Sequence, residues 1–302
     1  MPRVLIVGAS GVLGHAAAEH FLQKGFTVRS MARNPLKAAD LEQKGAQLIA
    51  GDLTDTSSLE HACKEVDIII AAAHGMLGKG KNSSNRVDDR GHRHLIEIAG
   101  RSGVQQFIYS SVYGCSEDHP IDFLRTKFAI EKYLEDSGLN YTILRLAAFM
   151  EWHVHNLLGK KIIDQGKAAI FGTGDNPTNF IAVKDIVKAL DKIVANPAYY
   201  KKIINLGGPE NISRNDVAAL YFKRLSISPR VSHVPLPLLK ILSGLFRPFH
   251  PGIARIMKLS VYMDKANAVM NKSESIEQFG LAPTGVDEFI EEVCRKKVKA
   301  SS

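Results

Sequence analysis

Short apolar stretches alternate with helix-forming stretches along the first half of the chain. The stretch Arg3 to Val7 is mostly apolar, and the stretch Phe26 to Met31 alternates between apolar and polar residues. Runs of about four to eight such residues, bounded by turn-forming residues, predict strands. The strands that we predict cover residues 3–7, 26–31, 46–50, 66–71, 106–111 and 141–146.

Stretches that favour helix lie between these strands, and glycines such as Gly103 and Gly138 end two of them. The predicted helices cover residues 15–22, 36–44, 57–64, 87–102 and 121–137. An uninterrupted alternation of strand and helix implies a parallel sheet with helices on both faces. We therefore predict an α/β fold built on a Rossmann-type doubly wound parallel sheet.

The alternation loosens after about residue 149. The sequence there predicts short strands at 168–172 and 202–206, an extended segment at 231–235, and helices at 183–195, 215–225, 236–246, 253–262 and 286–297. We interpret residues 1–150 as one domain and residues 151–302 as a smaller mixed C-terminal lobe.

Three glycines, each three residues apart, follow the first strand and precede the first helix. This strand–turn–helix context is typical of a dinucleotide-binding turn, although a plain glycine turn is the alternative. The first-turn N–H groups of the helix would face a diphosphate, with the helix dipole behind them. The residues that we expect to contact the cofactor here are Gly8, Ser10, Gly11, Val12, Leu13 and Gly14. We therefore interpret residues 1–150 as a dinucleotide-binding domain and residues 151–302 as a substrate lobe, and we expect the chain to return to the cofactor cleft near residues 180–186.

The residues after the second strand bear on which dinucleotide is bound. An acidic residue at this position binds a ribose hydroxyl, whereas a basic residue accommodates a 2′-phosphate. The stretch Arg29 to Asn34 has no acidic residue, and Arg33 lies nineteen residues after Gly14. We therefore expect NADP(H); the alternative is that Arg33 is a solvated loop residue.

Further candidate cofactor contacts follow the third and fourth strands. Asp52 could accept a hydrogen bond from the adenine amino group while Leu53 packs on the ring, or Asp52 could cap the next helix. Ala71, Ala72 and Ala73 are small enough for a ribose or nicotinamide to lie against the backbone, or they serve close packing.

Composition narrows the class of protein. Hydrophobic residues make up 45% of the chain and charged residues 23%, and the net charge is +8. Only the net charge favours nucleic-acid binding, which we do not predict. The three cysteines form no CxxC pair, and the first apolar run is the glycine-turn strand rather than a signal peptide. We expect a cytoplasmic protein without a membrane span.

The segment 235–246 is apolar and is followed by Arg247. It could form an interfacial membrane helix. We favour a helix that covers the substrate pocket or packs in the small lobe, because the segment is short and has no dense cationic face. We predict no metal site: His92 and His94, and likewise His153 and His155, are spaced so that they do not share a helix face.

Several of these motifs together resemble the atypical short-chain dehydrogenase/reductase superfamily, and most closely its NmrA-like NAD(P)H-binding group. The resemblance rests on 8–14, Arg33, Asp52-Leu53, the helix in 91–104, Ser110-Ser111, Lys127-x-x-x-Glu131, 141–145, 149–151 and 180–186. It implies a cofactor contact for Ser110 and Lys127. Ser110 or Ser111 could also bind a substrate carbonyl.

The chain departs from the catalytic pattern of that superfamily at one position. Catalytic members carry a tyrosine four residues before the lysine, but this chain has Phe123 there. A phenyl ring cannot transfer a proton. The candidates for a catalytic role are therefore Tyr113, His74, Ser111 and Lys127, and each has a structural alternative.

The resemblance and Phe123 leave three functional hypotheses. The first is an NADPH-dependent oxidoreductase that reduces a small carbonyl, enone or quinone-like compound. The second is a non-catalytic NADP(H)-binding regulator or assembly factor of the NmrA type. The third is a sugar-nucleotide epimerase-like enzyme, which the missing tyrosine disfavours.

Overall fold

The computed structural model describes residues 2–266 and 268–301. The chain divides into two compact units. The first contains residues 1–145 and 186–204, and the second contains residues 146–185 and 205–302. The domain division at residue 150 stays a prediction; in the structure, residues 186–204 group with the N-terminal part of the chain.

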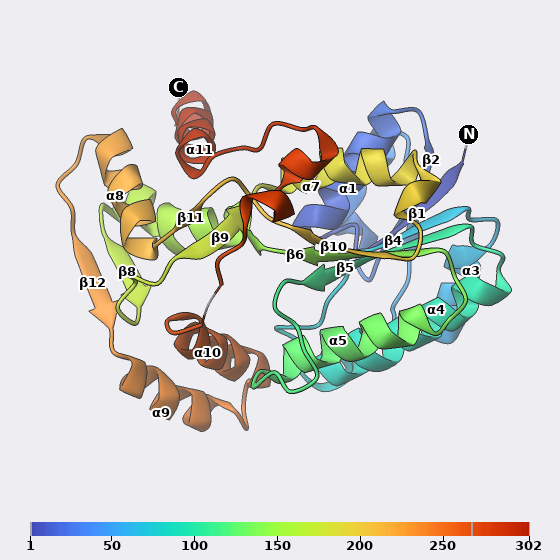
Figure 1. Cartoon of the computed structure of the whole chain (residues 1–302), viewed down its shortest axis with the longest axis horizontal. Helices are drawn as coiled ribbons and strands as arrows, with labels where there is room; N and C mark the ends of the chain where they lie inside the picture. Colours follow the sequence, from blue (N-terminus) through green and yellow to red (C-terminus); the bar gives the residue numbers. More distant parts are fainter. Residues whose placement is uncertain (1, 267, 302) are drawn as a thin grey trace. The chain divides into compact units, whose positions relative to one another are not determined.

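A seven-stranded sheet forms the core of the first unit (Figure 1). The boundary between the two units, after residue 204, falls within its strand β10. Its strand order is β10-β6-β5-β4-β1-β2-β3. The strands are β1 (Arg3–Val7), β2 (Thr27–Ala32), β3 (Gln47–Ala50), β4 (Ile68–Ala71), β5 (Gln106–Val112), β6 (Tyr141–Leu146) and β10 (Lys202–Leu206). The order reverses between β1 and β4, where β1 pairs in parallel with both β2 and β4. The predicted Rossmann-type fold is confirmed.

Helices cover both faces of this sheet (Figure 1). One face carries α1 (Val12–Gln23) and α7 (Val183–Val194), and the other carries α3 (Thr56–Cys63), α4 (His92–Arg101) and α5 (Asp122–Glu135). On the second face, buried side chains such as Leu59, Leu95 and Ile130 pack against Ile69 and Phe107 of the sheet. Each of the helices on this second face thus contributes an apolar stripe to the core beneath it.

Two predicted helices differ from the observed ones. The predicted helix at 36–44 is a 3₁₀ turn, Pro35–Ala38, followed by α2 (Ala39–Gln43). The side chain of Asn34 accepts from the Leu36 N–H at 3.1 Å and caps this tight turn. The predicted helix at 87–102 begins instead with a π-helical segment, Asn85–Gly91, which continues into α4.

The second unit is a mixed α/β structure. The three-stranded sheet has β9 (Thr178–Ile181) between β7 (Ala148–Phe149), which is parallel to it, and β11 (Asn211–Ile212), which is antiparallel. A second sheet pairs β8 (Ala168–Phe171) with β12 (Val231–Val234) in parallel. The sequence pattern did not predict β7, β9 or β11: β7 and β11 have two residues each, too few to show a period, and β9 begins with the polar residues Thr178 and Asn179.

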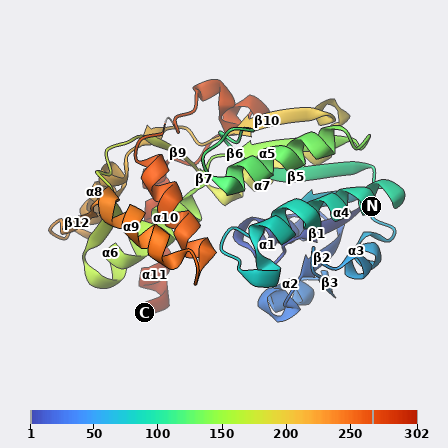
Figure 2. The same cartoon turned by 90° about the horizontal axis from the view of Figure 1, so that it is seen from below.

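Helices complete the second unit (Figures 1 and 2). They are the π-helical segment Met150–Gly159, α6 (Lys160–Gln165), α8 (Arg214–Leu225), α9 (Leu236–Phe246), α10 (Pro251–Met263) and α11 (Val286–Ser301). Val154, Phe180, Tyr221 and Ile290 are among the residues of its buried core. Within the described ranges, 2–266 and 268–301, no helix combines the length and the apolar character needed to cross a bilayer.

Candidate functional site

The glycine-rich turn between β1 and α1 excludes side chains. Gly8 has a φ of 95°, in the left-handed region that favours glycine. Its N–H donates to the carbonyl of Met31 at 3.0 Å and so ties the end of β1 to the end of β2. A Cβ atom on Gly14 would lie 2.3 Å from the carbonyl oxygen of Gly8. The close approach of helix and strand therefore requires glycine.

The N-terminus of α1 is open to an anion. Gly11 is the N-cap residue, and the first turn has neither a capping side chain nor an acidic residue. The N–H groups of a first helical turn lack intrahelical acceptors, and they lie at the positive end of the helix dipole. Ser10, Gly11 and Val12 are exposed, while Leu13 is anchored in the core. This arrangement suits a phosphate group.

The ends of β1 and β4 approach each other closely beside this turn. The Ala72 N–H donates to the Val7 carbonyl at 2.9 Å, which extends the pairing of the two strands. A Cβ atom on Gly8 would lie 2.8 Å from both the N and the Cα atoms of Ala73. The backbone thus forms a narrow cradle at the point where the strand order reverses. Ligands of doubly wound sheets bind at this point.

A pocket of about 420 Å³ lies in the first unit beside the end of β2. It is lined by Arg33, His74, Gly75, Leu77, Gly78, Lys79 and Asn82. Arg33 and Lys79 are both exposed and both cationic, so the pocket suits a phosphate. The sequence pattern singled out Arg33 but not Lys79. The signal for Lys79 was its position in the glycine-rich loop after the fourth strand.

Asp52 and Leu53 follow β3. One carboxylate oxygen of Asp52 accepts hydrogen bonds from the backbone N–H and the hydroxyl of Thr54, both at 2.9 Å. Asp55, rather than Asp52, caps α3, because its side chain accepts from the Ser57 N–H at 3.1 Å. Leu53 is buried, and its Cβ atom would be 2.7 Å from a Cβ atom on Gly91.

The buried carboxylate of Asp88 fixes the loop that lines the pocket. One oxygen accepts from the Gly75 N–H at 2.9 Å, and the other accepts from the Ser84 hydroxyl at 2.5 Å. Asp88 belongs to the π-helical segment before α4. The unusual helical segment therefore places a carboxylate under the loop, so that the loop has a defined conformation.

Lys127 of α5 is buried at the end of β5. Its amino group donates to the carbonyl of Ser110 at 2.9 Å and lies 4.6 Å from the centre of the Tyr109 ring. The ring of Phe123 is 5.7 Å away on the same helix. Burial lowers the pKa of Lys127, and the carboxylate of Asp88 partly opposes that shift. A lysine with a lowered pKa gives up a proton more readily than an exposed one.

The other candidate catalytic residues lie near the end of β5 or beside the pocket. Tyr113 is half-buried and directly follows β5. His74 is exposed, and its ring centre is 6.2 Å from that of Phe123. Ser111 is buried, and its hydroxyl donates to the Glu131 carboxylate. The roles predicted for these residues stay predictions; the Ser111 hydroxyl already has an internal acceptor.

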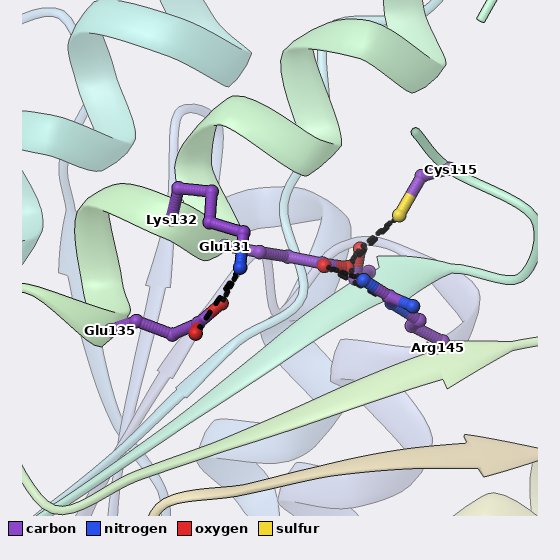
Figure 3. Close-up of polar contacts among 6 residues, drawn as sticks. Cys115, Glu131, Lys132, Glu135 and Arg145 are labelled. Carbon is purple, nitrogen blue, oxygen red and sulfur yellow. Dashed lines mark hydrogen bonds and ion pairs between the residues drawn. The ribbon is translucent and has the colours of Figure 1, made fainter. Parts of the chain in front are cut away.

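A buried charge network lies beside Lys127, centred on Glu131 (Figure 3). Arg145 donates to Glu131 through Nη2 at 2.6 Å and through Nε at 3.0 Å, and the Cys115 thiol donates at 3.0 Å. Glu131 is fully buried, and its hydrogen bond to Arg145 raises the pKa of that guanidinium. Burial, with the Glu131 charge, raises the pKa of Cys115 to about 12. This thiol is therefore structural rather than reactive.

His92 and Tyr109 form a second buried pair, with ring centres 5.3 Å apart. His92 Nδ1 donates to the Val87 carbonyl at 3.0 Å. Within the part of the chain that the structure describes, neither His92 Nε2 nor the Tyr109 hydroxyl has a hydrogen-bond partner. Burial lowers the pKa of His92 to about 4. Over the same described ranges, no cluster of three or more His, Cys, Asp or Glu side chains could hold a metal ion.

Comparison with known proteins adds a family to this geometry. The model of the NmrA-like family matches residues 2–290. The chain belongs to the NmrA-like family. The glycine turn, the Arg33 pocket and the Lys127 environment are thus features of an NmrA-like protein.

This NmrA-like chain is similar to a curated assembly factor. The photosystem II assembly factor Ycf39 of Synechocystis sp. is 25% identical over 305 residues. That alignment covers 98% of the chain and 92% of the Synechocystis protein.

Solved structures share the fold. The NADPH-dependent quinone oxidoreductase QOR2 of Escherichia coli, complexed with NADPH, has a TM-score of 0.77 and 21% identity. The triphenylmethane reductase of Citrobacter sp., complexed with NADP(H), also has a TM-score of 0.77, with 18% identity. Each comparison covers 97% of this chain and 99% of the other. At these identities the likeness concerns the fold.

Proposed function

We propose that this NmrA-like protein binds NADP(H) and reduces a small carbonyl, enone or quinone-like compound. The observation that carries the proposal is the cradle at Gly8, where a single added Cβ atom would lie 2.8 Å from the Ala73 backbone. A cradle that a methyl group would fill suits a diphosphate held against the backbone. The NADPH of the E. coli and the NADP(H) of the Citrobacter structures support the same cofactor.

The remaining cofactor contacts follow from the sheet order. Arg33 and Lys79, at one pocket, would hold the 2′-phosphate of the adenosine. Asp52 and Leu53 would contact the adenine. The backbone from Ala71 to Ala73, together with Ser110 and Lys127, would hold the nicotinamide half. The preference for NADP(H) over NAD(H) thus depends on the two cations of the pocket.

Lys127 is the best candidate for the proton donor. When bound, NADPH would supply a hydride to the substrate, and the chain would have to supply a proton to the substrate oxygen or its equivalent. Phe123 cannot donate one, and the Ser111 hydroxyl is bonded to Glu131. The Lys127 amine is positioned by Ser110, and burial lowers its pKa. Its ammonium form would act as the general acid.

Oxidation of NADPH by the purified full chain, with quinones, enones and aldehydes as substrates, tests the proposal. We expect substrate-dependent oxidation, and we expect Lys127→Met to lower kcat by about 100-fold or more. Lys127→Arg keeps the positive charge that Lys127→Met removes, so it is the matched control that separates the loss of the charge from the loss of the amine. Tight NADPH binding without turnover over a broad panel would contradict the reductase proposal.

A second function is favoured by the similarity to the Synechocystis assembly factor over almost the whole chain. In this alternative, the protein would bind NADP(H) and act as a regulator or assembly factor without catalysis. Phe123, in place of the usual tyrosine, is consistent with it. The same assay distinguishes the two functions: cofactor binding that persists in Lys127→Met, with no turnover in either form, favours the assembly factor.

A further inference from the structure

The outer face of α9 is apolar and exposed. Leu239 and Ser243, one helical turn apart, are buried and mark the inner face of the helix. Leu238, Ile241 and Leu245 are 45%, 68% and 62% exposed. Their spacing of three and four residues places them in one stripe along the helix. A surface helix normally has polar residues on such a stripe, so this face needs an explanation.

Another exposed apolar side chain follows the end of α9. α9 and α10 lie against each other in Figures 1 and 2, and a short turn joins them. Phe249, in that turn, is 74% exposed. We call Leu238, Ile241, Leu245 and Phe249 together the α9 patch. A patch of large apolar side chains that stay exposed in a folded protein marks an interaction surface.

The charge of the same segment is entirely positive. Residues 235–263 contain four lysines and arginines, and they contain no aspartate or glutamate. The next acidic residue, Asp264, is buried and accepts hydrogen bonds from the N–H groups of Thr173 and Gly174. Lys240 and Arg247, which lie in or directly after α9, are exposed.

Some basic residues elsewhere in the second unit have acidic partners on other elements. Arg224 of α8 forms ion pairs with Asp287 and Glu291 of α11, at 2.6 and 3.0 Å. The α9–α10 segment supplies no such partner from its own sequence. An apolar stripe on a segment whose cations have no acidic residue nearby in the sequence is complementary to a bilayer with anionic headgroups.

We propose that the α9–α10 hairpin binds the surface of membranes that contain anionic phospholipids. The α9 patch would enter the boundary between headgroups and acyl chains, and Lys240 and Arg247 would contact lipid phosphates. The proposal goes beyond the reductase function and does not depend on it. From the sequence we favoured internal packing for the apolar segment 235–246, because it is short. In the structure, however, its apolar stripe is exposed to solvent.

Co-sedimentation of the full chain with vesicles tests the proposal. We expect binding to vesicles of phosphatidylcholine and phosphatidylglycerol, and weak binding to phosphatidylcholine alone. The variant Ile241→Glu/Leu245→Glu should lower the partition coefficient by about 100-fold or more, because two large side chains lose their apolar environment. Lys240→Ala/Arg247→Ala should lower it by about 30-fold. Leu36→Glu is the matched control, since Leu36 is 82% exposed in the other unit.

A fluorescence readout covers the case in which the glutamate variant does not fold. The chain has one tryptophan, Trp152, so that Trp152→Phe/Phe249→Trp places the only indole in the α9 patch. Its emission should shift to the blue with the anionic vesicles, and high salt should reduce the shift.

Three results would overturn the proposal. One is that the wild-type chain does not bind anionic vesicles. Another is that Leu36→Glu weakens binding as much as the patch variant does. The third is a dimer in solution that the patch variant dissociates, without any vesicle binding, which would assign the patch to a second copy of this chain.

Discussion

Replacing Arg145 with methionine should leave the carboxylate of Glu131 buried without its cation. In the wild-type chain, Arg145 donates to both carboxylate oxygens through Nε and Nη2. Only the neutral donors Ser111 and Cys115 would remain. Breaking a fully buried ion pair costs about 3 to 5 kcal/mol. Because the Arg145 side chain is 24% exposed, we expect a loss of about 2 to 4 kcal/mol.

A double-mutant cycle with Glu131→Gln separates this charge effect from lost packing. The amide of glutamine keeps the shape of the carboxylate and removes its charge. The double variant Glu131→Gln/Arg145→Met should therefore be more stable than Arg145→Met alone. The coupling energy should be about 1 kcal/mol or more, because the two side chains are in direct contact.

Urea unfolding near pH 7 measures all four corners of this cycle. Equal slopes with denaturant would show that the mutations act on the folded state. Losses that simply add, or an Arg145→Met variant within about 0.5 kcal/mol of the wild type, would refute the ion pair as a stabilising contact.

Three further predictions concern the turn, the buried histidine and the lysine. Gly8→Ala should abolish NADPH binding and lower stability by about 2 kcal/mol or more, because φ is 95° and the added Cβ atom would lie 2.8 Å from the Ala73 backbone. A thermal-shift titration with NADPH measures both effects, and Gly100→Ala, where a Cβ atom meets nothing within 4 Å, is the control. Burial lowers the pKa of His92 to about 4, so below about pH 6.5 the unfolded state takes up a proton that the folded state does not, and the free energy of unfolding falls. Between pH 7 and pH 5, His92→Gln should lose about 2 kcal/mol less of this free energy than the wild type, measured by urea unfolding; the same pH dependence in both proteins would contradict this. Lys127→Arg should lower kcat about as strongly as Lys127→Met, because a guanidinium keeps the positive charge but does not give up its proton; a Lys127→Arg variant with the kcat of the wild type would exclude Lys127 as the acid.

The sequence predicted the first unit well because its strands and helices are strongly patterned and repeat in a regular order. The all-apolar strand at Ile68–Ala71 and the glycine turn after Val7 are local signals, and a parallel α/β sheet follows from their repetition. Asn34 and Pro35 favour a turn, and in the structure a 3₁₀ turn capped by Asn34 takes the place of the first part of the second predicted helix. The π-helical start of α4 has no local signature, since it depends on the buried contacts of Asp88.

The environment of the candidate site was harder to predict than its residues. The Glu131 network joins α5 to β6 and to the segment after β5, so that its hydrogen bonds appear only in three dimensions. Lys79 lies far from Arg33 in the sequence, and only the folded structure places both cations in the lining of one pocket. The exposure of Ile241 also depends on tertiary structure, because the sequence of an apolar helix is the same whether other elements cover its outer stripe or solvent does.

Titration calorimetry with NADPH and NADH tests the central proposal most directly. The wild-type chain should bind NADPH about tenfold tighter or more, and Arg33→Ala should lose most of that preference, because a charge-assisted contact to the 2′-phosphate is removed. Lys64→Ala, a change at another exposed cation of the same unit, should leave the preference intact. Equal affinity for the two cofactors in the wild type, or no binding of either, would contradict the account.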